Sequence, residues 1–372
     1  MSPLFLLRPG TVAGRLTLLL LMLPGFLQVS GRAHAQSVAY TVFELPGAGD
    51  GIQVPAGLNS FGDVVGRGPH SVESSTRATI WHQYSRTPKL LPALFAGEFT
   101  SASSINDLGE IVGASNTDQA LVPCFWTAAA SMQRVPLLPG HNAGQALAIN
   151  NHGQVVGYSS GAGGTRAFVW SRRTGARELA LLPGGNYSRA RGVNDADEII
   201  GMAGTATGEH AVFWSKDGSI HDLGTLAGDI SSTAMGINGA GDVVGYSKGV
   251  AGMRAFLWTK TGGMQDLGVL EGGNSSRAFN VNASRTVVGT STSAAGDRAF
   301  VWKPQVGMKD LNEAIPADQR LVLVEAHLIN NRGQIVVMGT RMEDSTDHVP
   351  TVADADVCAP APATVYLLTP SK

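Results

Sequence analysis

Residues 254–291 read RAFLWTKTGGMQDLGVLEGGNSSRAFNVNASRTVVGTS. Four short apolar or β-branched segments, at 254–259, 264–270, 277–282 and 286–291, are separated by turns rich in Gly, Asn and Ser. Alternating side chains with this punctuation are typical of β-strands joined by tight turns. We therefore expect a unit of four strands that alternate in direction, in which the AFLW strand comes first.

The same unit recurs along the chain with a period of about 44 residues. The six tryptophans follow this period, with gaps of 45, 44, 44, 44 and 44 residues, and they are Trp81, Trp126, Trp170, Trp214, Trp258 and Trp302. An asparagine that follows an aliphatic residue recurs with the same period, at Asn59, Asn106, Asn150, Asn194, Asn238, Asn282 and Asn330. Two markers with one period in the low forties predict the four-stranded blades of a β-propeller, and seven copies predict seven blades.

Several positions of the repeat have structural interpretations. We expect the tryptophans in blade cores rather than in a ring that stacks sugars, and each repeated Asn bonded to its own turn. The third residue after that Asn is Gly in five copies and Asp197 in a sixth, which predicts a positive φ. Arg285 departs from this pattern and leaves the conformation of its turn open. Gly also lies seven residues after the Asn in six copies, which predicts close backbone approach, whereas the last copy has Val337.

The two ends of the chain predict closure of the ring. Residues 38–47 match the second strand of the unit, and residues 364–370 match the missing first strand, with Tyr366 in the place of Phe256. Such a clasp removes an open sheet edge. We therefore expect an all-β, seven-bladed β-propeller in which the C-terminal strand completes the N-terminal blade. An open array and another seven-repeat β arrangement are the alternatives.

The start of the chain predicts export. Two arginines precede the apolar run 16–29, and an Ala-His-Ala triplet ends at Ala35, which is the order of a cleaved secretory signal peptide. The run is shorter than the roughly 20 residues of a comfortable membrane span, and an uncleaved anchor is the alternative. We expect a signal peptide over 1–35 and one propeller domain over 36–372, with an irregular insertion at about 341–363. The protein would then be secreted, periplasmic or on the cell surface, with no membrane span after cleavage.

The net charge argues against nucleic acid as a partner. Without the three arginines of the leader, 24 basic and 29 acidic residues remain, so the net charge is −5. Nucleic-acid binding needs a basic face, and nucleic acid is therefore not expected as a partner.

An oxidising compartment would permit a disulfide between Cys124 and Cys358. We interpret Cys124 instead as a small, buried strand residue.

The repeat resembles a known family. The strings AFLW…DLGVLEGGNSSRAFNVNASRTVVGTS and FWSKDGSIHDLGTLAGDISSTAMGINGAGDVVGYS (213–247) are similar to the bacterial extracellular HAF repeat. The shared pattern is FxW, DLGxL, a GG loop, xIN and VVGxS, over roughly residues 40–340. The resemblance implies a bacterial, exported protein and implies no reaction.

The sequence contains no motif that predicts catalysis, a metal or a cofactor. There is no H-E-x-x-H, P-loop or EF-hand loop, and GYSSG (157–161) and GYSKG (245–249) precede strands rather than the helix of a nucleophile elbow. The acidic residues of the 341–363 insertion do not have EF-hand spacing. Five histidines occupy non-equivalent positions and are expected on the surface or in loops, namely His82, His141, His152, His221 and His327. We expect no catalytic residue, no metal and no cofactor.

Binding is expected on the face formed by the longer, more variable loops, which connect the second and third strands of each unit and the fourth strand to the next unit. The polar candidates there are Asn142, Asn186, Tyr187, Asp229 and Asn274. Such side chains can hold hydroxyl-rich ligands, or they can simply satisfy the backbones of their own loops. We expect a non-catalytic binding or scaffold protein for an unknown extracellular glycan, matrix component or protein. The alternatives are an extracellular polymer hydrolase or lyase, with a site gathered from several blades, and a structural envelope or matrix component.

Overall fold

The computed structural model describes residues 39–47, 53–69, 76–83, 85, 87–94, 99–342 and 364–371. All of them lie in the compact unit that spans 37–372. The predicted signal peptide, residues 343–363 of the predicted insertion, and Cys358 lie outside the described residues.

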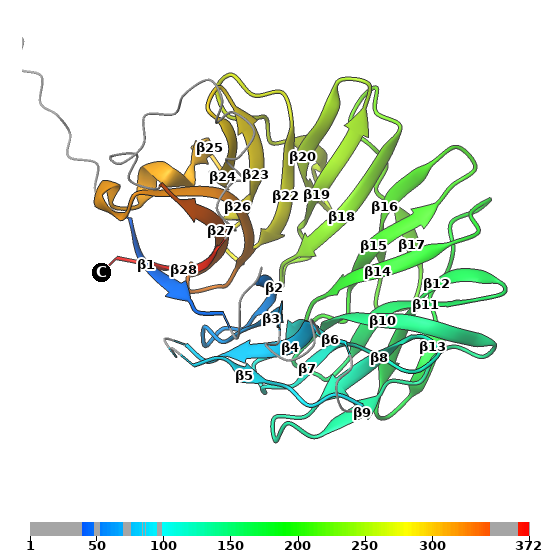
Figure 1. Ribbon diagram of the computed structural model, residues 1–372. Helices are drawn as coiled ribbons and strands as arrows, with labels where there is room; N and C mark the ends of the chain where they lie inside the picture. The colour runs from blue at the N-terminus through cyan, green and yellow to red at the C-terminus, as the bar shows by residue number, and fades with distance from the viewer. Residues whose placement is uncertain are drawn as a thin grey trace, which may run out of the picture. The chain divides into compact units, whose positions relative to one another are not determined.

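Seven four-stranded antiparallel sheets make up the fold. Figure 1 shows these sheets arranged as blades around a common axis. The described residues contain only two short 3-10 helices, η1 (Leu311–Ala314) and η2 (Ala317–Gln319). The predicted all-β, seven-bladed propeller is therefore confirmed.

The first four blades follow one another along the chain, each with its strands in order from the axis outward. Blade 1 consists of β2 (Val54–Leu58), β3 (Val64–Pro69), β4 (Thr76–Trp81) and β5 (Lys89–Leu90). Blade 2 consists of β6 (Thr100–Ile105), β7 (Ile111–Asn116), β8 (Leu121–Trp126) and β9 (Met132–Arg134). Blade 3 consists of β10 (His141–Ile149), β11 (Val155–Gly161), β12 (Gly164–Ser171) and β13 (Gly175–Glu178). Blade 4 consists of β14 (Ser188–Val193), β15 (Ile199–Gly204), β16 (Glu209–Trp214) and β17 (Ile220–Asp222).

The remaining three blades complete the ring. Blade 5 consists of β18 (Ser231–Ile237), β19 (Val243–Gly249), β20 (Gly252–Thr259) and β21 (Gly263–Asp266). Blade 6 consists of β22 (Ser276–Val281), β23 (Val287–Ser293), β24 (Gly296–Lys303) and β25 (Gly307–Asp310). Blade 7 consists of β26 (Leu321–Ile329), β27 (Ile335–Arg341), β28 (Thr364–Pro370) and β1 (Tyr40–Leu45).

The AFLW strand is the third strand of each blade, so the predicted strand order was wrong by two positions. In blade 5 this strand is β20, and it pairs with β19 across the hairpin closed by Gly249 and Gly252. Its other partner is the outermost strand, β21. The next strand in the chain, β22, belongs to blade 6. Periodicity sets the spacing of strands but not where one blade ends, because a repeat can be divided at any point.

Both ends of the described chain are held in blade 7. Strand β1 pairs with β28 over six residues, from Tyr40 opposite Pro370 to Leu45 opposite Val365. Tyr366 lies opposite Val337, in the position that Phe256 takes in blade 5. The predicted closure is therefore confirmed, and the first described strand, β1, is the outermost strand of the blade that also contains the last one, β28 (Figure 1).

Most of the tryptophans lie in the core, as predicted. Five are at most 7% exposed, and Trp258 is only partly buried. Three indole N–H groups also donate to backbone carbonyls of an earlier connection, namely Trp81 to Pro46, Trp126 to Pro92 and Trp214 to Ala180. Cys124 is a free, buried strand residue, and burial raises the pKa of its thiol to about 12.

Candidate functional site

The turns after the repeated Asn share one geometry. In all seven, the side-chain Oδ1 accepts hydrogen bonds of 2.9–3.1 Å from the backbone N–H groups two and four residues later. The residue three positions after the Asn has a φ between 58° and 94° in every copy. Arg285 adopts this conformation as well, with a φ of 58°, so its turn does not differ. Both predictions about these turns are confirmed.

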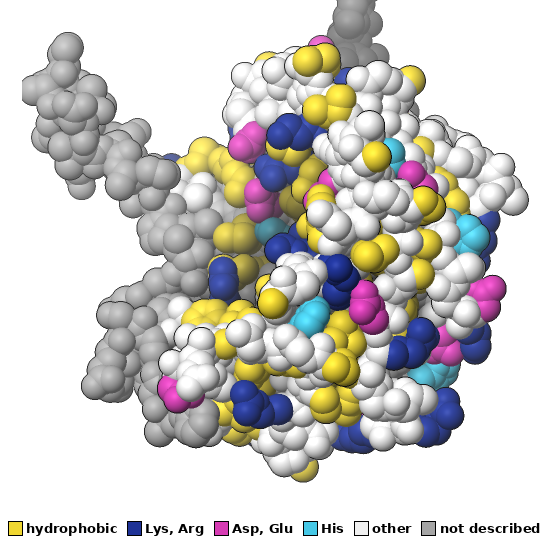
Figure 2. Space-filling view, turned by 90° about the vertical axis from the view of Figure 1, so that its right-hand side faces the viewer, with side chains coloured by type: hydrophobic (Ala, Val, Ile, Leu, Met, Phe, Trp, Pro, Cys, Tyr) yellow, Lys and Arg dark blue, Asp and Glu magenta, His cyan; other side chains and the backbone are white. Residues whose placement is uncertain are grey.

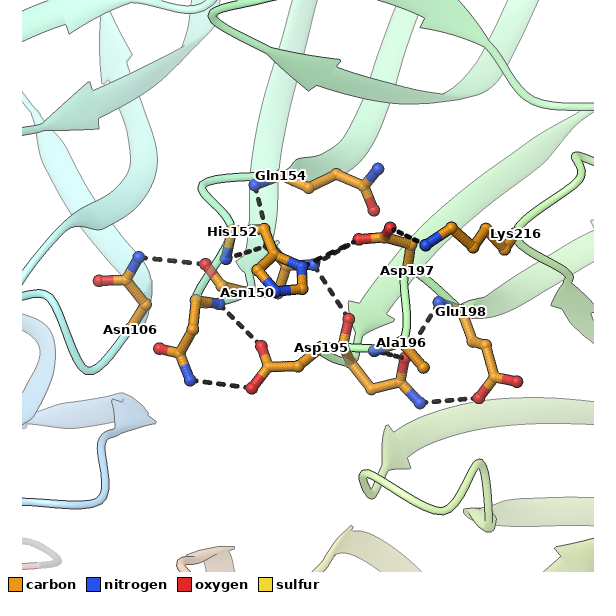
Figure 3. A network of polar contacts seen from close by, with 11 residues as sticks. Asn106, Asn150, His152, Gln154, Asp195, Ala196, Asp197, Glu198 and Lys216 are labelled. Carbon is orange, nitrogen blue, oxygen red and sulfur yellow. Dashed lines mark hydrogen bonds and ion pairs between the residues drawn. The ribbon is translucent and has the colours of Figure 1, made fainter.

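The same asparagines also join neighbouring blades, which the sequence did not reveal. The Asn150 amide donates to the backbone carbonyl of Asn194, and the Asn106 amide donates to that of Asn150 (Figure 3). Six such bonds of 3.0–3.3 Å are present among the described residues, and the last runs from Asn330 back to Asn59. We call this set the Asn ring. It lies around one end of the axial channel, where it lines a cavity of 260 Å³.

The residues that follow the Asn ring make this end of the channel polar. Asp107 accepts from the backbone N–H and the hydroxyl of Ser60, at 2.8 and 2.9 Å. Asp195 accepts from the backbone N–H and the amide of Asn151, at 2.8 and 2.9 Å (Figure 3). We call this end the turn mouth. Its two carboxylates give it a negative charge, and both already accept two hydrogen bonds from the preceding blade.

Deeper in the channel, all seven innermost strands carry a β-bulge at the same position, three residues before the Asn. The extra residue is Ala56, Ser103, Leu147, Arg191, Met235, Phe279 or His327. A bulge redirects a side chain out of the regular pleat. All seven of these residues line a second cavity of 390 Å³, and we call them the bulge ring.

The Gly seven residues after the Asn makes room for this bulge. In blade 5 it is Gly245, which pairs with Ala234 immediately before the bulged Met235. A Cβ on Gly245 would lie 2.0 Å from the backbone oxygen of Thr233, so no larger residue fits there. The predicted close approach is therefore confirmed. In blade 7, β26 has an additional bulge between Leu323 and Glu325, and Gly339 lies opposite it.

An aliphatic ring separates the turn mouth from the bulge ring. It consists of the residues that immediately precede the repeated Asn, namely Leu58, Ile105, Ile149, Val193, Ile237, Val281 and Ile329. Leu58, Ile149, Val193 and Ile237 line both cavities, so the two spaces meet at this ring. The channel therefore changes from polar to aliphatic to mixed along its axis.

One side of the bulge ring carries an aromatic and ionisable group of residues. The rings of Phe279 and His327 are stacked, with centroids 5.2 Å apart and planes 6° apart. His327 Nε2 lies 2.9 Å from Glu325 Oε2, and the contact is an ion pair when the imidazole is protonated. His327 lowers the pKa of Glu325 below its ordinary value. The prediction that His327 lies on the surface or in a loop was wrong, because the bulge turns it into the channel.

Neighbouring blades are also fastened by ion pairs on the turn side. Lys216 Nζ lies 2.9 Å from Asp197, which also contacts His152 of the preceding blade (Figure 3). The Arg285 guanidinium donates two hydrogen bonds to the carboxylate of Asp242 in the preceding blade, at 2.8 and 3.1 Å. These residues belong to the turns and the third-to-fourth strand hairpins. The contacts of Asp197 with His152 and of Asp242 with Arg285 join neighbouring blades, whereas Lys216 and Asp197 pair within blade 4.

The predicted binding residues lie on the opposite face, in the connections that enter blades 3 to 6. Asn142 lies at the start of β10, and the others precede β14, β18 and β22. Asn142, Asn186 and Asn274 are exposed. The structure therefore places all five on one face but in four different blades, and none of them lines either channel cavity.

Some of these side chains bond to their own surroundings. The Tyr187 hydroxyl donates to Glu209 at 2.9 Å, and burial together with this carboxylate raises the pKa of Tyr187 to about 12. Asn274 Oδ1 accepts from the Thr292 hydroxyl at 3.2 Å. Asp229 has one buried carboxylate oxygen without a hydrogen bond. A ligand role for this face stays a prediction.

Surface charge is mixed where it can be seen. On the face in Figure 2, Lys and Arg side chains lie among Asp, Glu and His, with apolar side chains between them. Within the described ranges, no group of three or more His, Cys, Asp or Glu side chains is arranged to hold a metal ion. No helix in the described part of the chain is long and apolar enough to cross a bilayer.

The fold and its axis define a closed seven-bladed β-propeller with a layered channel. No family model and no curated protein matches the chain. Among solved structures it is similar to a streptogramin B lyase, with a TM-score of 0.53 and 12% identity over 90% of this chain and 98% of that one. It is also similar to a catalytically inactive variant of virginiamycin B lyase from Staphylococcus aureus with quinupristin, with a TM-score of 0.54 and 11% identity over 89% and 99%.

A third similar structure is the β-propeller domain of the trilobed protease from Pyrococcus furiosus. Its TM-score is 0.51, with 10% identity over 78% of this chain and 90% of that one. At these identities the likeness shows the fold alone.

Proposed function

We propose that this chain is an exported, non-catalytic binding propeller that holds part of an extracellular ligand in the bulge ring of its channel. The observation that supports this is the variation of the bulge position among the seven blades. It carries Ala, Ser, Leu, Arg, Met, Phe and His in turn. The residue directly before it is Ala in six blades, and the residue three positions after it is Asn in all seven.

Repeats keep one residue at a position when every blade uses it for the same packing or bonding task. The Asn ring and the glycines opposite the bulges are such positions. The bulge position has the same backbone geometry in each blade but faces a cavity rather than a neighbour. Its side chains are therefore free to differ, and seven different side chains around one space form an asymmetric surface. Ligand sites are usually cavities of about 300–1,000 Å³, and this one is 390 Å³.

Export and origin rest on the sequence. The order of charge, apolar run and Ala-His-Ala triplet supports a signal peptide over 1–35, and the similarity to the HAF repeat supports a bacterial, extracellular protein. We propose the ligand as part of a glycan, a matrix component or a protein outside the cytoplasm.

A hydrolase or lyase that acts on an extracellular polymer is the second candidate, and one observation favours it. His327 Nε2 lies 2.9 Å from Glu325 Oε2 beside the channel. A neutral imidazole oriented by a carboxylate can serve as a general base. Turnover of a bound polymer that is lost in His327→Ala while binding remains would favour the enzyme over the binding protein.

The test of the binding proposal is a thermal-melt screen against polysaccharide fragments, divalent ions and small organic acids, repeated with two variants. Ala56→Phe fills the channel, and Phe279 shows that the equivalent position of blade 6 accepts this side chain. Asn274→Ala alters the loop face instead. A ligand at about 100 times its Kd adds roughly 2.7 kcal/mol, which raises the melting temperature by a few degrees.

The two variants separate the possible sites. A ligand shift that disappears in Ala56→Phe and persists in Asn274→Ala supports the channel. The reverse pattern would contradict the channel and support the loop face. Absence of any shift, together with concentration-dependent self-association, would favour a structural envelope or matrix component.

A further inference from the structure

The guanidinium of Arg191, in the bulge ring, has no carboxylate partner among the described residues. Its Nε is buried and makes no hydrogen bond. No carboxylate of the described residues lies within ion-pair distance of it. Other arginines of the propeller do pair with a carboxylate, namely Arg166, Arg172, Arg254, Arg285, Arg298 and Arg341. A partly buried guanidinium without a partner is costly, which makes this position hard to explain by packing alone.

The two neighbours of Arg191 in the bulge ring are apolar. Its neighbours in the ring are Leu147 of blade 3 and Met235 of blade 5. Further round the ring, Phe279 and His327 form a stacked pair. Ala56 and Ser103, the two smallest side chains, occupy blades 1 and 2 and leave that side of the channel open. In a ring of seven blades, blade 4 lies opposite the junction of blades 7 and 1, so Arg191 faces this open side and the aromatic pair.

The charges along the axis favour entry of an anion from the loop face. Asp107 and Asp195 make the turn mouth negative, and the aliphatic ring lies between them and Arg191. An anion would be repelled from the turn mouth and attracted to the guanidinium.

From these features we infer that the bulge ring binds a carboxylate with an apolar or aromatic body. This inference rests on the proposed binding function and names its ligand class. The carboxylate contacts the Arg191 guanidinium, whose planar array of donors matches two carboxylate oxygens. The body of the ligand lies over Ala56 and Ser103, beside the rings of Phe279 and His327. A carboxyl-bearing group of a larger extracellular molecule satisfies the same chemistry as a free acid.

The experiment measures the binding of 2-naphthoate and of its neutral analogue 2-naphthamide by isothermal titration calorimetry. Both have the same aromatic body, and only one has a charge. The protein is expected to bind naphthoate at least about tenfold more tightly, since a hydrogen bond to a charged group typically contributes that much or more. In Arg191→Met, the affinity for naphthoate falls to that for naphthamide, and the affinity for naphthamide stays within about twofold. Arg67→Met, which removes an exposed guanidinium outside the channel, leaves both affinities unchanged.

Two further outcomes distinguish the ligand class from the site. Equal affinities of the wild type for the two probes, or no binding of either, would overturn the carboxylate inference. A preference for naphthoate that survives in Arg191→Met would overturn it as well. If Ala56→Phe abolishes binding of a ligand from the melt screen in those cases, the channel stands as the binding site. If Ala56→Phe leaves the binding of every ligand and probe intact, the proposed site itself fails.

Discussion

The side-chain amide of Asn330 donates a 3.1 Å hydrogen bond to the backbone carbonyl of Asn59, although 271 residues separate the two in the chain. This bond joins the innermost strands of blades 7 and 1. It closes the ring near the axis, while the pairing of β28 with β1 closes it near the rim. The ring is thus closed at two distances from the axis, by the Asn330 side-chain hydrogen bond near the axis and by the pairing of β28 with β1 near the rim.

Loss of the Asn330 side chain should destabilise the protein. Asn330→Ala removes the bond to Asn59 and leaves the backbone N–H groups of Arg332 and Gln334 without their acceptor. Buried polar groups without partners cost about 1–3 kcal/mol each, and we expect a loss of about 2–4 kcal/mol. Urea denaturation measures this change. The exposed Asn142→Ala is the control, with a change of about 0.5 kcal/mol or less. Equal effects of the two substitutions would contradict the role of the Asn ring.

Two tryptophans at the same position of the repeat should differ in their contribution to stability. Trp214 is completely buried and its indole donates to Ala180, whereas Trp258 is only partly buried. Trp214→Ala should lower the free energy of unfolding by about 3–5 kcal/mol. Trp258→Ala should lower it by less, below about 3 kcal/mol. Chemical denaturation of both variants tests the difference. A change under about 1 kcal/mol for Trp214→Ala would remove it from the core.

Deletion of the C-terminal strand should open the ring. A chain that ends at residue 363 lacks β28, which leaves β27 unpaired on one side and takes away the strand that β1 pairs with. Unpaired strand edges invite association with other chains. We expect a lower melting temperature and light scattering that rises with protein concentration. A chain shortened only by residue 372 serves as the control. A monomeric, equally stable truncated chain would show that the clasp is dispensable.

The contact between Asp242 and Arg285 should make stability depend on pH. Burial acts to raise the pKa of Asp242, but the Arg285 guanidinium and the Asn238 amide hold it below its ordinary value. A carboxyl whose pKa is lower in the folded state than in the unfolded state contributes stability above the unfolded pKa, about 3.9. That contribution is lost as the pH falls through the folded pKa.

The corresponding measurement compares melting temperatures of the wild type and Arg285→Met between pH 7 and pH 3. The variant should melt at a lower temperature at pH 7, and the difference should shrink below about pH 4. Arg173→Met removes an exposed guanidinium from the same side and should show little difference at any pH. A gap between wild type and Arg285→Met that stays constant over this range would contradict the assignment.

Much of the fold could be predicted because the repeat reports on local geometry. The spacing of the tryptophans and asparagines gives seven equal units, and Tyr366 in the place of Phe256 identifies the clasp strand. The strand order within a blade could not be derived in this way. The order of strands within a blade depends on which consecutive strands pair with each other. Strands β19 and β20 pair across a two-residue connection and belong to one blade, whereas the longer connection after β21 leads to the next blade.

The site was harder to predict for a related reason. Asn142, Asn186, Tyr187, Asp229 and Asn274 were selected because loops usually carry binding residues, and the structure leaves them apart in four blades. The bulge ring had a signal in the sequence, since the position three residues before the Asn varies between otherwise similar copies. From the sequence, a strand residue at that spacing is interpreted as a core residue. The bulge that turns it into the channel is seen only in the register of the paired strands.

The sequence by itself determined the architecture, from the number of blades to the clasp and the conformation of the turns, because these follow from short-range chemistry repeated at a fixed spacing. Only the tertiary structure decided that seven separate asparagines form a ring, that Arg191, Phe279 and His327 share one cavity, and which strands make a blade. The physical reason is that closure of the ring brings equivalent positions of distant repeats together around one axis. These contacts are long-range, so the local sequence pattern does not predict them.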